Sequence, residues 1–329
     1  MKLDSSLFVD VAEALGVGNP AIVEKDYFVV QLLTHLASVQ LPYHQLVFSG
    51  GTALAKSTIK TFRMSEDVDL KLVPKPSFAE IDSRNSRRKV RKAAKQAIES
   101  LILASKTFVL EKPADVLDEY RYMLFEIRYP QEHRQAPCLR PFIKLELIES
   151  QLLCSAEPRN IQSIYAQVLS LSAEVDNFSC AAIIETQAEK LLSMMRRTAS
   201  VARNSERNDD ESLIRHIYDT YHIQRAQPSN IEQLGALVTQ AIRTDVERYG
   251  SQHPQMVESP IQELRFGLSL LTEDAKFMQR YTDYVSPMVY ASTSVPWPEA
   301  LATFVQLSNA VLDYAEHEFY AAPIEPLRS

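Results

Sequence analysis

Apolar residues in the first half of the chain recur with two different periods. Positions 22, 29, 32, 33 and 36 are apolar and follow the repeat of an amphipathic helix, and residues 84–106 are also predicted to be helical. The segments Asp67–Val73, Tyr122–Tyr129 and Phe142–Ile148 instead alternate polar and apolar residues, which predicts strands of one sheet. Leu46-Val47-Phe48 is a further short apolar strand, and it runs into Ser49-Gly50-Gly51.

The pattern changes after about Leu152 and becomes predominantly helical. Ile183–Arg197 and Leu213–Ile223 are amphipathic, and the polar segment Asn204–Asp210 between them is typical of an exposed loop. More helices follow from Ile231, with breaks at His253-Pro254 and within Ser286–Pro298. The pattern therefore predicts an α+β protein. A mixed β-sheet domain with flanking helices would span residues 1–152, and a mainly helical domain would span residues 153–329.

Composition narrows the class of protein without naming its chemistry. Of 329 residues, 46% are hydrophobic and 23% are charged, which is ordinary for a globular chain with a sizeable core. No window approaches the ~20 apolar residues of a membrane helix, and the first residues carry no signal-peptide core. The three cysteines, Cys138, Cys154 and Cys180, are odd in number and widely spaced. These features predict a cytoplasmic protein with reduced thiols.

The segment Ser49-Gly50-Gly51-Thr52 is the first candidate for chemistry. A strand that runs into two glycines and then a helix lets backbone N–H groups approach a phosphate. The alternative is an ordinary tight turn.

Asp67 and Asp69 form the second candidate. At positions i and i+2 of a strand, both carboxylates project from one face. Two such charges repel each other unless a cation lies between them, and Mg²⁺ is bound by this kind of oxygen ligand beside substrate phosphates. The alternative is a pair of solvated acids on an exposed strand face.

Taken together, these segments resemble a known family. Phe48-Ser49-Gly50-Gly51-Thr52-Ala53-Leu54, followed by Arg63-Met64-Ser65-Glu66-Asp67-Val68-Asp69-Leu70, is similar to the first motif of the AbiEii family of nucleotidyltransferase toxins. Glu24-Lys25-Asp26-Tyr27 resembles the N-terminal segment of that family. Ala188–Arg197 is similar to the family's helix with an essential lysine, and Arg215–Tyr221 is similar to its later motif with a catalytic aspartate.

The resemblance implies a nucleotidyltransferase fold in which Lys190 binds the triphosphate and Asp219 contributes to catalysis. It implies a nucleoside triphosphate as donor, Mg²⁺ with Mn²⁺ as the alternative metal, and an RNA acceptor such as the 3′ end of a tRNA. It further implies a role in a toxin–antitoxin or phage-defence system, with a cognate antitoxin as partner. The chain departs from the family at His216, where an aspartate is common, and in an insertion around Arg203–Glu211.

Nucleotidyl transfer commonly uses a third acidic metal ligand on a strand beside the first two. Lys144 and Glu146 alternate with apolar neighbours, so their side chains share a polar face. Glu146 is the candidate ligand, Glu126 is the alternative, and a solvated edge acid is the other interpretation. Phosphate contacts are predicted for Ser49, Gly50, Gly51, Thr52, Arg63 and Ser65.

A run of basic residues suggests where a nucleic acid would bind. Arg84, Arg87, Arg88, Arg91, Lys92 and Lys95 fall on one face of the predicted helix. Such a face is typical of a surface that contacts RNA phosphates, although charge runs more often mark a solvated helix. Because the net charge is −7, this local concentration of positive charge favours a specific role.

Other functions find less support in the sequence. No Gly-x-Ser-x-Gly motif predicts a serine hydrolase, and no Gly-x-x-x-x-Gly-Lys-Ser/Thr loop predicts a kinase. Two alternatives to the RNA-modifying toxin remain. One is a nucleotidyltransferase that modifies a small molecule, which would not need the basic helix. The other is a non-catalytic nucleotide-binding protein of the same fold, and the intact Asp67, Asp69 and Lys190 argue against it.

Overall fold

The computed structural model describes residues 5–134, 139–290 and 294–321. Cys138 lies outside these residues. The chain divides into two compact units, and each is described by itself. The sheet unit comprises residues 1–182 and 288–292, and the helical unit comprises residues 183–287 and 293–329. The first unit thus extends 30 residues beyond the expected division at residue 152, since two more strands join its sheet.

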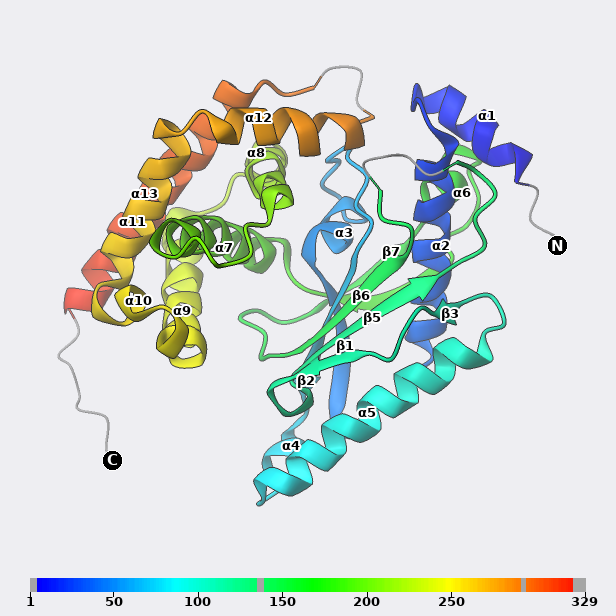
Figure 1. The fold of residues 1–329 in the computed structure, drawn as a ribbon, viewed down its shortest axis with the longest axis horizontal. Helices are drawn as coiled ribbons and strands as arrows, with labels where there is room; N and C mark the ends of the chain where they lie inside the picture. Colours follow the sequence, from blue (N-terminus) through cyan, green and yellow to red (C-terminus); the bar gives the residue numbers. More distant parts are fainter. Residues whose placement is uncertain (1–4, 135–138, 291–293, 322–329) are drawn as a thin grey trace. The chain divides into compact units, whose positions relative to one another are not determined.

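An eight-stranded mixed sheet forms the centre of the sheet unit (Figure 1). The strands are β1 His44–Ser49, β2 Val68–Pro74, β3 Val109–Leu110, β4 Asp115–Leu117, β5 Tyr122–Arg128, β6 Ile143–Glu149, β7 Glu157–Ile161 and β8 Val175–Cys180. Their order is β3-β5-β6-β2-β1-β8-β7, with β4 paired to β5. β2 runs antiparallel to β1 and parallel to β6. The strands expected at residues 67–73, 122–129 and 142–148 are therefore confirmed.

The two faces of the sheet differ in polarity, as the alternation requires. Val68, Leu70 and Leu72 of β2 are buried in the main core, and the residues between them belong to the opposite face. The core also contains Val29, Leu32 and Leu33 of α2 and Ile98 and Ile102 of α5. These two helices therefore cover the apolar face, which leaves Asp69 on the other face.

Two long helices and several shorter ones complete the sheet unit. Its helices are α1 Ser6–Leu15, α2 Pro20–Ala37, α3 Gly50–Ala55, α4 Pro76–Ala79, α5 Arg84–Ala104 and α6 Ile164–Val168, with a 3₁₀ turn η1 at Asp118–Tyr120. Asn19 caps α2 by accepting a 2.9 Å bond from Ala21 N–H, ahead of Pro20 in the first turn. Among the described helices, no single one has both the length and the apolar composition needed to cross a membrane, and only the bent pair α1 and α2 passes that test together.

The helical unit is built around α7 Ile183–Arg203 (Figure 1). Its other elements are η2 Glu211–Ile214, α8 Arg215–Ala226, α9 Ile231–Tyr249, η3 Gly250–Gln252, α10 Pro254–Glu258, α11 Pro260–Glu273, α12 Lys276–Tyr284 and α13 Trp297–Ala321, and η4 spans Ser286–Met288. A side chain at Gly267 of α11 would lie 2.0 Å from the carbonyl oxygen of Met195, so glycine lets α11 approach α7 closely. The break expected at His253-Pro254 is confirmed, because α10 begins at Pro254.

The segment after α12 returns to the sheet unit. Met64 N–H donates to the Met288 carbonyl oxygen at 2.8 Å, and Tyr290 N–H donates to Phe62 O at 2.8 Å. The predicted break within Ser286–Pro298 therefore contributes an extended piece that pairs beside the residues leading into β2.

Candidate active site

The two aspartates lie at the start of β2. Asp67 directly precedes the strand, and Asp69 is its second residue. Within the sheet, Asp69 pairs with Ser49 of β1 and with Glu146 of β6. Because neighbouring strands are about 4.8 Å apart and residues in register share a face, the Asp69 and Glu146 side chains project side by side.

Glu126, the alternative third ligand, lies one strand further from β2. It pairs with Lys144 across β5 and β6, and its Oε1 lies 3.2 Å from the Lys112 ammonium. The strand register therefore favours Glu146 over Glu126 as the partner of Asp69.

Gly50 is shaped to accommodate Asp69. Its φ is +74°, in the left-handed region, and a Cβ at this position would lie 2.0 Å from Asp69 Oδ2. Any other residue would therefore meet both backbone strain and a direct clash. The first glycine of the pair thus brings the loop after β1 close to the carboxylate.

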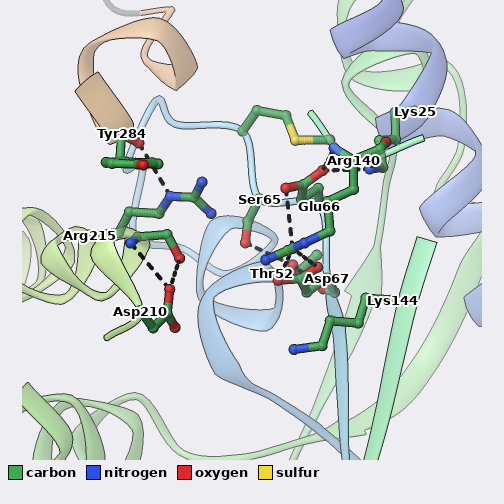
Figure 2. Close-up of polar contacts among 12 residues, drawn as sticks. Lys25, Thr52, Ser65, Glu66, Asp67, Arg140, Lys144, Asp210, Arg215 and Tyr284 are labelled. Atoms are coloured by element: carbon green, nitrogen blue, oxygen red, sulfur yellow. Dashed lines mark hydrogen bonds and ion pairs between the residues drawn. The ribbon is translucent and has the colours of Figure 1, made fainter. Parts of the chain in front are cut away.

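The hydroxyl groups of this region hold the loop to β2. Ser49 Oγ donates to the Asp69 carbonyl oxygen at 3.2 Å. Thr52, which is buried, lies 2.9 Å from Ser65 Oγ and also hydrogen-bonds to the Asp67 carbonyl (Figure 2). The predicted phosphate-binding residues Ser49, Thr52 and Ser65 are thus gathered around the two aspartates, and two of their hydroxyls fix the backbone there.

Arg63 and Gly51 differ in their accessibility. Arg63 is 3% exposed, and its Nη1 donates to the Met64 carbonyl at 2.9 Å. Gly51 is partly exposed. Arg63 therefore has a structural role in the segment before β2, whereas the backbone of Gly51 remains accessible.

Two of the three candidate metal-binding carboxylates form ion pairs with basic side chains. Arg140 Nη1 donates to both oxygens of Asp67, at 2.6 and 2.9 Å (Figure 2). Lys144 forms an ion pair with Glu146. Burial acts to lower the pKa of Lys144, but the Glu146 carboxylate, with Asp67 further away, raises it above its usual value. The polar face of the sheet thus carries alternating acids and bases.

The family-like Glu24-Lys25-Asp26-Tyr27 segment supports this site from α2. Lys25 Nζ lies 2.5 Å from Glu66 Oε2 and 2.8 Å from the Arg140 carbonyl oxygen. Burial lowers the pKa of Lys25, and the Glu66 carboxylate opposes that effect. Glu66 also accepts a 2.8 Å bond from Arg140 N–H. Lys25 and Glu66 therefore connect α2 to the residues on either side of Asp67.

The neighbouring acids of the same segment fix other parts of the unit. Glu24 accepts bonds from the backbone of Glu132 and His133, and Asp26 binds Lys56 at 2.5 Å and Ile164 N–H at 2.6 Å. The whole segment is therefore structural support, and its side chains reach distant parts of the chain.

In the helical unit, Lys190 of α7 and Asp219 of α8 contact each other directly. Lys190 Nζ lies 2.9 Å from Asp219 Oδ2, and the two side chains are 6% and 1% exposed. The structure thus brings together the lysine and the aspartate that the sequence assigned separately. In this structure the Lys190 ammonium binds a carboxylate.

Hydrogen bonds and ion pairs fix the segment around Arg203–Glu211, where the insertion is expected. Asp210 Oδ1 accepts bonds from the Ser212 backbone N–H at 3.2 Å and from the Ser212 hydroxyl at 2.7 Å, which caps η2. Arg280 of α12 holds Asp209 at 3.0 Å. Arg215 Nε donates to the Tyr284 carbonyl oxygen at 3.2 Å. The exposed loop predicted at residues 204–210 is therefore present, and ion pairs attach it to α12.

The basic helix α5 is less uniform than its sequence suggested. Arg91 is 2% exposed and forms a bidentate ion pair with Glu149: Nε lies 2.7 Å from Oε2 and Nη2 lies 2.8 Å from Oε1. Burial raises the pKa of Glu149, but hydrogen bonds from His44 and Arg91 outweigh it and lower the pKa to about 2. The prediction that Arg91 contacts RNA is wrong, since this guanidinium is already committed to the sheet.

The other basic residues of α5 are at least partly accessible. Arg84 binds Glu119, Lys95 binds Glu99 at 2.8 Å, and Arg87 donates to the Ile81 carbonyl oxygen at 2.8 Å. Arg88 lies over the Tyr120 ring, 5.5 Å from its centroid, and both Arg88 and Lys92 are exposed. The accessible cations of the predicted surface are therefore Arg84, Arg88 and Lys92, with Arg87 and Lys95 half-buried.

Comparison with known proteins shows the family of the chain. Residues 31–306 match the family model described as nucleotidyl transferase AbiEii toxin of type IV toxin–antitoxin systems. The chain belongs to the AbiEii family. It is accordingly a nucleotidyltransferase of the toxin class, as its motifs predicted. No curated protein matches the chain.

One solved nucleotidyltransferase structure supports the fold of this AbiEii chain. MenT4, a nucleotidyltransferase toxin from Mycobacterium tuberculosis H37Rv, is 18% identical to this chain with a TM-score of 0.61, and the superposition covers 96% of each chain. A putative nucleotidyltransferase from H. pylori is 12% identical over 92% of this chain and 98% of that one, with a TM-score of 0.42. At such identities the MenT4 likeness supports the fold alone.

AbiEii-type nucleotidyltransferases generally use a divalent metal, and the candidate site offers oxygen ligands for one. Asp67, Asp69 and Glu146 supply the hard carboxylate oxygens that Mg²⁺ prefers; Asp69 lies against Gly50 and is in register with Glu146. Among residues 5–134, 139–290 and 294–321, no group of three His, Cys, Asp or Glu side chains is already converged as a metal cage. The three carboxylates are therefore suitable ligands for Mg²⁺, and in this structure Asp67 and Glu146 form ion pairs with Arg140 and Lys144.

Sequence reasoning missed Arg140, Lys25 and Glu66 as parts of this AbiEii site. Lys25 and Glu66 stood inside quoted motifs, but nothing in their spacing indicated that they contact each other across 41 positions. Arg140 precedes β6 without any periodic signal. A basic residue close to a strand that carries a candidate metal ligand is the one hint that was available.

Proposed function

We propose that this AbiEii-family enzyme transfers a nucleotide from a nucleoside triphosphate to an RNA acceptor, such as a tRNA 3′ end, and releases pyrophosphate. The observation that carries the proposal is the placement of Asp69 beside Glu146 on the polar face of the sheet, with Gly50 packed against the Asp69 carboxylate. Like charges so close together are costly unless cations neutralise them, and catalysis would use that arrangement.

The reaction breaks a phosphoanhydride bond of the triphosphate and forms a phosphoester bond to the acceptor. An acceptor hydroxyl oxygen attacks the α-phosphorus in line, a new O–P bond forms, and the bond from the α-phosphorus to the bridging oxygen breaks. Pyrophosphate leaves with that electron pair, and the hydroxyl proton passes to solvent or to a carboxylate. Most of the catalysis lies in positioning the reactants and in balancing charge.

Asp67, Asp69 and Glu146 would hold Mg²⁺, or Mn²⁺ as the alternative. When bound, the metal would neutralise charge on the phosphates and make the attacking hydroxyl more acidic. The backbone of Gly50 and Gly51, with Ser49, Thr52 and Ser65, would line the phosphates, while Arg63 supports the backbone. Lys190 and Asp219 are proposed to take part in catalysis on the strength of the family motifs.

The accessible part of α5 favours RNA over a small acceptor. Arg84, Arg88 and Lys92 project from one helix, and their long cationic side chains suit contacts to successive phosphates. An enzyme that modifies a small molecule gains nothing from such a surface. That enzyme is the second candidate, and a non-catalytic nucleotide-binding protein is the third. We further propose a cognate antitoxin as partner, in keeping with the family.

The acceptor is tested by binding and transfer with Arg88→Gln/Lys92→Gln. If both residues contact RNA phosphates, RNA binding weakens regardless of sequence, and the slope of log affinity against log salt falls by about 1.4–1.8 units. The matched control is Arg265→Gln/Lys276→Gln, which makes the same charge change in the helical unit and should leave the slope unchanged. Equal RNA affinity and slope in wild type and variant would favour the small-molecule enzyme.

A further inference from the structure

Arg140 occupies the place where a metal would bind Asp67. Its Nη1 lies 2.6 and 2.9 Å from the two Asp67 oxygens, so both oxygens are engaged. The two side chains are 35% and 25% exposed, which leaves the contact open to solvent. A divalent cation could bind Asp67 only if this guanidinium moved away, because the two positive charges repel each other and compete for the same lone pairs.

The backbone of Arg140 is anchored independently of its side chain. Arg140 N–H donates to Glu66 Oε2 at 2.8 Å, and its carbonyl oxygen accepts a 2.8 Å bond from Lys25 Nζ (Figure 2). Lys25 and Glu66 form a buried ion pair, with side chains 0% and 2% exposed. Glu66 Oε1 also accepts a 3.3 Å bond from Arg140 Nη1. The guanidinium therefore lies between Asp67 and Glu66 on a stem whose base is fixed, so it remains close to the site after leaving Asp67.

Binding of metal and substrate would change the charge balance of the site. Asp67, Asp69 and Glu146 carry three negative charges, which Arg140 and Lys144 partly balance through their ion pairs. A metal on the carboxylates would leave these cations in surplus, whereas a triphosphate brings new negative charge to the same place. A guanidinium fork matches phosphate oxygens in geometry as well as charge.

We propose that Arg140 is an exchange cation: it neutralises Asp67 before substrate binds, and it binds the phosphates of the nucleotide once Asp67 turns to the metal. Lys25 and Glu66 are positioning residues that hold its backbone. This inference rests on the proposed metal site. Within the Glu24–Tyr27 segment, it assigns Lys25 the role of keeping a mobile cation at the site.

The test measures two affinities of the full-length chain with opposite expected changes. In Arg140→Gln, Mn²⁺ titrated without nucleotide and followed by electron paramagnetic resonance should bind about five- to tenfold more tightly, because its competitor is gone. A non-transferable triphosphate analogue, titrated at saturating Mn²⁺, should bind roughly tenfold more weakly. Arg140→Lys keeps the charge but loses the fork, so it should retain wild-type Mn²⁺ affinity and still weaken the analogue.

Controls separate this inference from the metal site on which it rests. Arg128→Gln removes an exposed arginine of β5 that pairs with Glu111, and it should change neither affinity. Asp69→Asn should abolish Mn²⁺ binding; Mn²⁺ affinity equal to wild type in that variant would overturn the metal site itself. If Asp69→Asn loses Mn²⁺ but Arg140→Gln leaves Mn²⁺ affinity unchanged or weaker, or leaves analogue affinity unchanged, the exchange role of Arg140 is overturned and the metal site stands.

Discussion

The buried ion pair between Lys190 and Asp219 should contribute to stability as well as to activity. Their side chains are 6% and 1% exposed, and the contact is 2.9 Å long. Lys190→Met would deprive a buried carboxylate of its ammonium partner, and Asp219→Asn would do the reverse. Removing one member of such a pair costs about 3–5 kcal/mol, because the other charge remains desolvated. For a domain of this size, that corresponds to a fall in the melting temperature of roughly 10 °C.

Replacing both members separates stability from catalysis. In Lys190→Met/Asp219→Leu neither charge of this pair remains, so no unpaired charge is left at the site and most of the lost stability should return. Calorimetry would measure melting temperatures, and transfer of a labelled nucleotide would measure activity. A double variant that is stable but inactive supports the catalytic assignment, whereas recovered activity would make the pair structural.

An exposed ion pair in the same unit is the control for this prediction. Arg265 lies 2.6 Å from Asp313, whose side chain is 71% exposed. Arg265→Met should therefore cost less than about 1 kcal/mol. The reasoning is refuted if Lys190→Met melts within the experimental error of wild type, or if it loses no more stability than Arg265→Met.

Two further predictions concern the sheet unit. The pKa of Glu149 is lowered to about 2 from an ordinary 4.5, so its ionised form stabilises the fold above pH 4.5, and this contribution is lost as the pH falls toward 2. In urea unfolding, the free energy of unfolding of Glu149→Gln should therefore be roughly 3 kcal/mol below that of wild type at pH 7, and the difference should shrink toward zero in acid. A difference that does not depend on pH would contradict this prediction. Gly50→Ala should strongly reduce nucleotide transfer, because its Cβ would lie 2.0 Å from Asp69 Oδ2 at a φ of +74°, whereas Gly18→Ala has nothing within 4 Å and should behave as wild type in the same assay.

The sequence predicted those parts of the fold that depend on periodicity. Alternation over residues 67–73 and 142–148 identified β2 and β6 and placed Asp69 and Glu146 on polar faces, because successive side chains of a strand point to opposite sides. β7 and β8 escaped detection, since Glu157–Ile161 is largely polar and both strands lie at one edge of the sheet. The expected division at residue 152 moved to residue 182 for that reason.

Contacts between distant residues could not be predicted from spacing. Helical periodicity put Arg91 on the basic face of α5, but the carboxylate that buries it, Glu149, lies 58 positions away. Arg140 and Lys25, likewise, are 115 positions apart. Which charged side chain faces solvent and which faces a partner is decided by packing, and a single sequence does not record that choice.

The proposed function depends above all on Asp69 as a residue of the catalytic centre. The most direct measurement incubates wild type and Asp69→Asn with each α-labelled nucleoside triphosphate, Mg²⁺ and total RNA, counts the label in RNA, and follows pyrophosphate release in a separate coupled assay. Wild type should label RNA with at least one triphosphate and Asp69→Asn with none, while the variant's melting temperature stays close to wild type. Transfer by Asp69→Asn at the wild-type rate would show that Asp69 is not part of the catalytic centre.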